Sequence, residues 1–186
     1  MKSRSGKFEK AIATSVLSLV VVILGSNVAL ASDITPENVI YLINSKRTYY
    51  GLEPLKIDQS LDSAAQAKTT DMINRDYFEH YAFGLTPWDF MKKANYNYLY
   101  AGENLAMNFQ TSEGMVNAWM NSPLHRANIL NPDYNEMGLG IVKGAYTENN
   151  KTQETIIVDN MFGRQKPVIL DFFDNFIAKV TAIFKF

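Results

Sequence analysis

The stretch AWMNSPLHRANILNPDYNEMGLGIV, residues 118–142, contains the change of pattern that decides the fold. Its first residues end a segment, 112–121, whose apolar side chains recur at helical spacing. Its last residues begin MGLGIVKG (137–144), a run that is typical of a strand. A helix and a strand in such close succession predict a domain that mixes both kinds of element.

His125 lies between these two patterns and is one of only two histidines in the chain, the other being His80. Each follows a predicted helix and lies in polar, loop-like surroundings. Between them stands Glu103, in AGENLA (101–106), flanked by small and apolar residues. Two imidazoles and a carboxylate suit zinc or a related divalent cation, so these three residues are the candidate metal ligands. The alternative is two ordinary polar histidines and a buried glutamate bonded to the backbone.

Three further helices are predicted from start and stop signals upstream of this stretch. An N-cap residue followed by proline begins two of them, at Thr35 and Thr86. Residues that tolerate left-handed geometry end these two, at Gly51 and Asn95. The predicted helices cover residues 36–50, 59–76 and 88–94.

Strand signals are clearest in the second half of the chain. Residues 137–144 and 154–162 are predicted strands, and the polar residues 145–153 are predicted to form a hairpin loop between them. YLYAGENLAM (98–107) is predicted to be either a short strand or an irregular link. Two glycines inside the first strand, Gly138 and Gly140, indicate that another backbone passes close by.

Residues 1–31 form a predicted export signal, because basic residues precede a charge-free, largely apolar run from Ala11 to Ala31. The small residues Ala29 and Ala31 predict cleavage before Ser32. An uncleaved membrane anchor is the alternative, since a run of this length can span a bilayer. In both cases we expect the rest of the chain to be extracellular or part of the cell envelope.

Charge and cysteine content exclude several functions. Without residues 1–31 the chain has 14 basic and 18 acidic side chains, a net charge of −4, and no basic run. Nucleic acid is therefore not an expected partner. The chain has no cysteine, which excludes disulfides, thiolate metal sites and a cysteine nucleophile.

The last residues, 167–186, again have the helical pattern, with phenylalanine and isoleucine recurring on one side. They predict a C-terminal amphipathic, Phe-rich helix. Its charged residues argue against a membrane span. It is expected either to dock on the domain or a partner, or to lie on a membrane surface.

Six pieces of this sequence, in the same order, resemble a bacterial domain of the CAP superfamily, which comprises cysteine-rich secretory, antigen 5 and pathogenesis-related 1 proteins. The resemblance implies a CAP (SCP-like) domain over residues 36–163, of α+β class and built as an α-β-α sandwich. The pieces are VIYLINSKRTYYGLEPLKIDQSLDSAAQAKTTDM (39–72), DYFEH (76–80), TPWDFMKKANYNY (86–98), AGENLA (101–106), residues 118–142 and DNMFG (159–163).

The resemblance also implies a cleft with two histidines and two glutamates, some of which bind zinc or other divalent ions in studied relatives. His80 and His125 match the two histidines, and Glu103 matches the acid of the family's Gly-Glu-Asn motif. The second acid of many eukaryotic members is missing, and Ser122 falls near its place; Glu113 is an unmatched substitute. A His-Glu-His triad is therefore expected, with Glu103 as the base if the protein is an enzyme.

The neighbours of these residues are interpreted mainly as scaffold. Gly102 and Asn104 are expected to allow and brace the bend that aims Glu103. Trp88 and Trp119 are predicted core residues. Glu136 is expected at a strand entrance, and Arg126 is either a cleft cation or part of a surface pair.

Three classes of function are consistent with this sequence. The favoured one is a secreted or envelope binding protein whose cleft takes a divalent ion and an unknown extracellular ligand, because no activated nucleophile is evident. The second is a metal-assisted hydrolase, such as a peptidase. The third is an envelope or membrane interaction protein that uses residues 167–186.

Overall fold

The computed structural model describes residues 34–167, 169–170, 172–173, 177 and 180–181. The predicted export signal, residues 1–31, lies outside the described residues. From Pro36 to Gln165 the elements follow in the order α1 (Pro36–Tyr49), β1 (Lys56–Ile57), α2 (Gln59–Arg75), α3 (Pro87–Lys93), β2 (Tyr98–Met107), α4 (Ser112–Asn121), α5 (Pro123–Ile129), β3 (Glu136–Glu148) and β4 (Lys151–Gln165).

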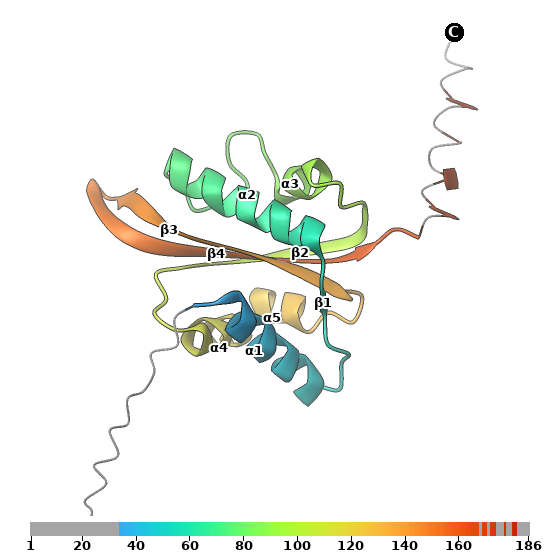
Figure 1. Cartoon of the computed structure of the whole chain (residues 1–186), viewed down its shortest axis with the longest axis horizontal. Helices are drawn as coiled ribbons and strands as arrows, with labels where there is room; N and C mark the ends of the chain where they lie inside the picture. The colour runs from blue at the N-terminus through green and yellow to red at the C-terminus, as the bar shows by residue number, and fades with distance from the viewer. Residues whose placement is uncertain (1–33, 168, 171, 174–176, 178–179, 182–186) are drawn as a thin grey trace, which may run out of the picture.

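The strands form one sheet in the order β1-β3-β4-β2, in which β1 is parallel to β3 and the other pairs are antiparallel. Helices α2 and α3 cover one face of the sheet, and α1, α4 and α5 cover the other (Figure 1). The expected α+β class and α-β-α sandwich are therefore confirmed. Strand β2 lies at an edge of the sheet, opposite the edge formed by β1.

The helices begin where capping residues satisfy their first backbone N–H groups. The Asp58 carboxylate accepts from the backbone N–H groups of Ser60 and Leu61, which starts α2. Thr86 and Asp89 form a reciprocal capping box at the start of α3, and Asn95, with φ of 62°, follows its end. The predicted helices 36–50, 59–76, 88–94 and 112–121 agree with the observed ones to within one residue at each end.

Helix α2 packs directly on β3 through two glycines. A Cβ on Gly138 would lie 2.1 Å from the carbonyl carbon of Leu61, and one on Gly140 would lie 2.2 Å from the Ala65 carbonyl oxygen. Only hydrogen fits at these two positions, so the close backbone approach predicted for both glycines is confirmed. This contact fixes the height of α2 above the sheet, and with it the position of the loop that follows α2.

Residues 145–153 were predicted to form a polar loop, and this prediction was wrong. Strands β3 and β4 continue through most of this segment, and only Asn149 and Asn150 form the turn. Both asparagines adopt left-handed geometry, with φ of 52° and 61°, as a tight hairpin turn requires. The segment lacks alternating apolar residues because this end of the hairpin is largely exposed, so polarity suggested a loop.

Two other predictions are resolved by the structure. Residues 98–107 form the regular strand β2 rather than an irregular link. His125 does not lie in loop-like surroundings, because it belongs to α5, a seven-residue helix that follows α4 after Ser122. Pro123 at its first position allows this second helix to start immediately and in a new direction.

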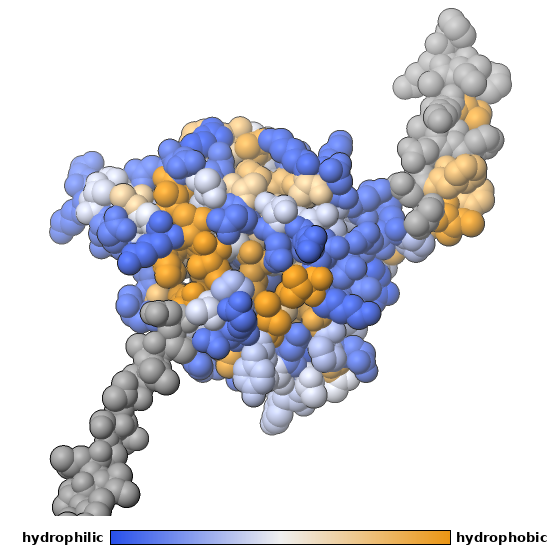
Figure 2. All heavy atoms as spheres, in the orientation of Figure 1, coloured by the Kyte–Doolittle hydropathy of each residue, from blue (hydrophilic) through white to orange (hydrophobic). Residues whose placement is uncertain are grey.

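Only part of the predicted helix over 167–186 falls within the described residues. Those residues between 169 and 181 are helical, and most of their apolar side chains are exposed, Val180 being half-buried (Figure 2). Among the helices that the structure describes, none is both long and apolar enough to cross a membrane. The exposed apolar residues of this segment are Ile169, Leu170, Phe172, Phe173 and Ile177.

Candidate functional site

The candidate site lies beside β2 and is centred on a contact between His80 and Glu103. The Nδ1 atom of His80 is 2.5 Å from Oε2 of Glu103. The Glu103 side chain is 2% exposed, whereas that of His80 is 46% exposed. A buried carboxylate thus orients an imidazole that solvent can reach, and it favours the tautomer with the proton on Nδ1.

A buried lysine on α2 supports this pair. The ammonium group of Lys68 lies 3.4 Å from Oε1 of Glu103, and both side chains are almost fully buried. It also donates hydrogen bonds to the backbone carbonyls of Glu79, at 3.2 Å, and His80, at 2.7 Å. One side chain therefore neutralises Glu103 and holds the loop that carries His80.

Asp159 of β4 adds a second buried carboxylate to this cluster. It pairs with Leu105, two residues from Glu103 along β2, and therefore lies on the same face of the sheet as Glu103. Within the described part of the chain, neither of its carboxylate oxygens has a hydrogen-bond partner. Burial raises the pKa of Asp159 well above its ordinary value, and the charge of Glu103 raises this pKa further. When Asp159 is protonated, the negative charge of Glu103 and the positive charge of Lys68 are the two that remain, and they balance each other.

His125 reaches the same region from the opposite face of the sheet. Its Nδ1 lies 2.8 Å from Oγ of Ser122, and its backbone carbonyl accepts a hydrogen bond from the Asn104 side chain. Burial lowers the pKa of His125, and the charge of nearby His80 lowers this pKa further. The neutral form of His125 is therefore favoured.

The three candidate ligands are only partly brought together. His80 and Glu103 touch, whereas His125 faces Ser122. No group of three or more His, Asp or Glu side chains in the part of the chain that the structure describes is placed to hold a metal ion. Within the described residues, His80 therefore has Glu103 as its side-chain partner, and His125 has Ser122.

The outer edge of β2 is held by side chains from the α4–β3 region. The carbonyl of Glu103 accepts a hydrogen bond from Nδ2 of Asn128. The carbonyl of Ala101 accepts one from the Tyr134 hydroxyl, and that of Leu105 accepts one from Nε1 of Trp119. Alternate carbonyls of the strand are fixed in this way, so the backbone of Glu103 has little freedom to shift.

Gly102 and Asn104, on either side of Glu103, make this arrangement possible. A Cβ on Gly102 would lie 2.5 Å from the Tyr134 hydroxyl oxygen, so a larger residue would displace the tyrosine. The Asn104 side chain donates to His125 and accepts from Asn128, which joins β2 to α5. Both residues brace Glu103 within a regular strand; the bend that the sequence suggested is absent.

A pocket of about 290 Å³ opens beside His80 and Glu103. Tyr81, Trp88 and Asn128 are among the residues that line it. Trp88 was predicted to be a core residue, but it is only half-buried and forms part of the pocket wall, whereas Trp119 is buried as predicted. The pocket combines aromatic walls with an oriented imidazole, which is the usual composition of a small-molecule site.

The remaining sequence candidates have structural roles. Glu136, at the start of β3 as expected, accepts a hydrogen bond from the Tyr96 hydroxyl at 2.6 Å. Glu113 lies in the first turn of α4, where an acid stabilises the helix. Arg126 forms a surface pair, because its guanidinium lies 4.8 Å from the ring centre of Tyr50.

Lys68 and Asp159 were not predicted as site residues. A signal for Lys68 did exist, because it follows Leu61, Ala64 and Ala65 at helical spacing on the buried face of α2. A lysine on that face requires a buried partner. Asp159, in the apolar run TIIVDNMF, is a similar signal.

The sequence model of the cysteine-rich secretory protein family (CAP) matches residues 40–158 of this chain. The protein YkwD of Bacillus subtilis is 44% identical over 109 residues, which are 58% of this chain and 42% of that protein. The membrane protein YlbC of the same organism is 32% identical over 115 residues, which are 61% of this chain and 33% of that protein. This chain thus spans less than half the length of either relative.

Two solved structures have a similar fold. An extracellular protein of Bacillus anthracis that contains an SCP domain superimposes with a TM-score of 0.58 and 25% identity, over 72% of this chain and 45% of that one. An outer surface protein of Borrelia burgdorferi superimposes with a TM-score of 0.57 and 25% identity, over 72% of this chain and 96% of that one.

Proposed function

Because this chain belongs to the cysteine-rich secretory protein (CAP) family, we propose that it is exported and that the pocket beside His80 binds a ligand outside the cytoplasm. The predicted export signal supports this location. So do the descriptions of two structural relatives as an extracellular and an outer surface protein. A leader that stays uncleaved would hold the same domain at the membrane.

The contact between His80 and Glu103 carries this proposal. Since Glu103 occupies Nδ1, the Nε2 atom of His80 is the group left for a ligand. Lys68 and the β2 edge contacts hold the pair in place without a ligand. A preorganised imidazole in a pocket with aromatic walls can accept a hydrogen bond from a small polar ligand while Trp88 and Tyr81 contact its apolar part.

A divalent cation such as zinc is the first ligand to test at this site. A carboxylate bonded to one imidazole nitrogen is the usual support of a metal-binding histidine, and His125 adds a second neutral imidazole. In this arrangement His80 and His125 would hold the ion through Nε2, and Glu103 would orient His80 rather than act as a ligand. Bound zinc would supply a Lewis acid with open positions for a further ligand.

The test is a calorimetric titration of zinc into the full chain and into His80→Ala and His125→Ala chains with unchanged thermal unfolding. We expect micromolar or tighter binding that both substitutions abolish. Glu103→Gln should weaken binding less than either, because it changes only the support of His80. Absence of binding, or binding that neither histidine affects, would contradict a metal site shared by the two histidines.

A hydrolase is the second candidate, and the same contact favours it. A buried carboxylate on Nδ1 with Nε2 exposed is the base half of a catalytic triad, and His80 could remove a proton from water. Hydrolysis of peptide or ester probes that disappears in His80→Gln and falls with Glu103→Gln would support it. Activity that persists in His80→Gln would exclude His80 as the base.

A further inference from the structure

A second surface, distant from the His80 pocket in the fold, has the composition of a binding site. It lies on α1, in the layer of helices on the opposite face of the sheet from α2 and α3 (Figure 1). Helix α1 buries Val39, Ile43 and Arg47 against the rest of the protein. Its outer side presents Tyr41, Ser45 and Tyr49, four residues apart and therefore on one face of the helix.

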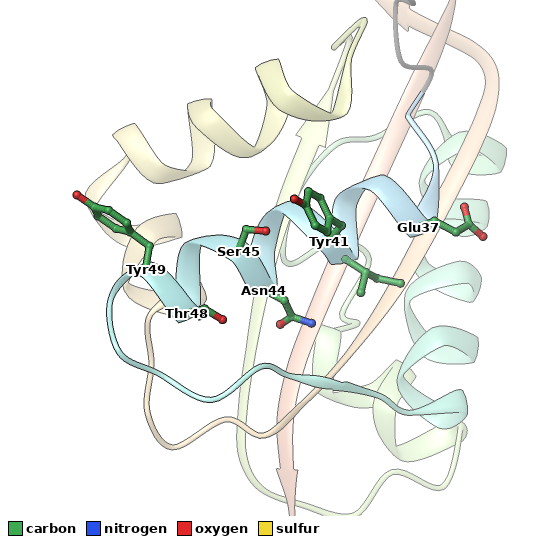
Figure 3. A pocket seen from close by; sticks show the side chains of 7 residues that line it. Glu37, Tyr41, Asn44, Ser45, Thr48 and Tyr49 are labelled. Atoms are coloured by element: carbon green, nitrogen blue, oxygen red, sulfur yellow. The ribbon is translucent and has the colours of Figure 1, made fainter.

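The two tyrosines of this row are unusually exposed. Tyr41 is 71% exposed and Tyr49 is 81% exposed. Figure 3 shows both rings on the same side of α1 as Ser45, with Asn44 and Thr48 on the other side. Eight residues of helix place Tyr41 and Tyr49 about 12 Å apart along its axis. The row is long enough to contact several units of a linear polymer.

Hollows flank this row on both sides. One, of about 860 Å³, lies beside Asn44 and Thr48. The other, of about 720 Å³, lies toward α4 and is bordered by Asn117 and Asn121. Tyr41, Ser45 and Tyr49 border both hollows, so the row forms a ridge along the outer side of α1. We call this surface, formed by Tyr41, Ser45, Tyr49, Asn117 and Asn121, the tyrosine ridge.

The polar groups of the tyrosine ridge are available to a ligand. Within the described part of the chain, no hydrogen bond involves the hydroxyls of Tyr41, Ser45 and Tyr49 or the side-chain amides of Asn117 and Asn121. By contrast, the Asn44 amide is used internally, since it donates to and accepts from the backbone of Leu55. The charged groups near the ridge have both signs, Glu37 on one side and Lys46 and Arg126 on the other.

This combination fits a neutral sugar polymer better than other ligands. Flat aromatic rings can pack against the apolar faces of pyranose rings, and free hydroxyl and amide groups can pair with sugar hydroxyls and acetamido groups. A nucleic acid would require a concentration of positive charge, which is absent. A protein interface would have a continuous apolar centre, whereas Ser45 and the exposed amides of Asn117 and Asn121 interrupt the aromatic rings here.

We propose that the tyrosine ridge binds the glycan strands of bacterial cell-wall peptidoglycan, a linear chain of N-acetylated hexosamines. The rings of Tyr41 and Tyr49 pack on alternate parts of the chain, and Ser45, Asn117 and Asn121 bond to its acetamido and hydroxyl groups. An exported protein would be held at the wall in this way, while the pocket beside His80 remains open on another side.

The test is co-sedimentation of the full chain with purified peptidoglycan, with soluble chitohexaose as competitor. We expect Tyr41→Ala and Tyr49→Ala each to weaken binding roughly tenfold, and the double variant to remain in solution. Tyr100→Ala is the matched control, because Tyr100 is also exposed but lies on β2, and it should bind as the unchanged chain does. Both ridge tyrosines are exposed, so thermal unfolding should not change.

Three results would overturn the proposal. They are absence of sedimentation of the unchanged chain, equal weakening by Tyr100→Ala, and binding that the double variant retains. His80→Ala separates this inference from the proposed function, because it should leave sedimentation unchanged. Loss of sedimentation in His80→Ala alone would place the glycan in the pocket beside His80 and exclude the tyrosine ridge.

Discussion

At the scale of single residues, the cluster of Lys68, Glu103 and Asp159 explains how a charged site can exist inside this domain. An isolated buried charge is strongly destabilising, whereas a pair with good geometry approaches balance. Lys68 is 1% exposed and faces Glu103, and burial together with the charge of Glu103 raises the pKa of Asp159, which disfavours a second negative charge beside Glu103. The orientation of His80 is therefore maintained by groups that never reach the solvent.

Replacing Lys68 by methionine tests this balance. The substitution leaves Glu103 and Asp159 buried together without a cation, and it frees the carbonyls of Glu79 and His80. We expect the free energy of unfolding to fall by on the order of 3 kcal/mol, measured by urea denaturation. Lys151→Met is the control, because Lys151 is exposed, and it should change the unfolding free energy by less than about 0.5 kcal/mol. Equal effects of the two substitutions would contradict the role of Lys68.

The sequence identified the two histidines and the glutamate of the candidate site, but not the residues that support them. His80, Glu103 and His125 were identified because rare residue types match a family motif. The position of Lys68 on the apolar face of its helix predicts burial but does not identify its partner. Its partner Glu103 is 35 positions away along the chain, and only the packing of α2 on the sheet shows that they meet. Their spacing along the sequence also could not show which of the three predicted ligands contacts a bound molecule and which supports another residue.

At the scale of elements, the contact of α2 with β3 sets the geometry on which the His80 loop depends. The backbone of α2 rests on Gly138 and Gly140, so the helix cannot rotate or rise without opening the core. Lys68 lies on the same helix, one turn beyond Ala64 and Ala65. Any displacement of α2 would therefore move the ammonium group away from Glu103.

Gly138→Ala tests how far this contact tolerates added volume. The new methyl group would overlap the backbone of Leu61 and Asp62, so α2 must move, and we expect a loss of about 3 kcal/mol in unfolding free energy. Gly144→Ala in the same strand is the matched control, because its methyl would meet only the Ile73 side chain, which can rotate. A loss in Gly138→Ala no larger than in Gly144→Ala would contradict the close packing.

Helices were predicted more accurately than the hairpin for a physical reason. Each predicted helix carries its own start signal, such as Asp58 or Thr86, which acts within one turn of the chain. The outer half of the β3–β4 hairpin has no such local signal. It depends on pairing between the strands, for example between Thr147 and Thr152, whose hydroxyls lie 2.9 Å apart. The sequence of either strand alone does not indicate pairing of this kind.

At the scale of the whole molecule, the described part of segment 167–186 raises the question of what its apolar side chains contact. Most of the apolar side chains that the structure describes there are exposed. This arrangement is consistent with the expectation of a membrane-surface helix and with that of a helix that docks on a partner.

Deleting residues 167–186 tests whether this segment contributes to the stability of the domain or to membrane binding. Compared with a chain of residues 32–186, the shortened chain should keep the same thermal midpoint, because none of the residues that it loses and the structure describes is buried. We expect it to co-sediment less with anionic phospholipid vesicles, since the exposed phenylalanines are removed. Phe172→Ser with Phe173→Ser should reproduce the loss. Equal partitioning of the long and short chains would exclude the segment as a membrane contact.

The side chains along β2 have a consequence for the protein at high concentration. An edge strand with free carbonyls can form backbone hydrogen bonds with the edge strand of another molecule. Repeated addition of molecules in this way leads to fibrils. Asn128, Tyr134 and Trp119 already occupy three alternate carbonyls of this edge. The residues that keep Glu103 in place therefore also protect the protein from self-assembly, and substitutions that loosen them would expose it to aggregation.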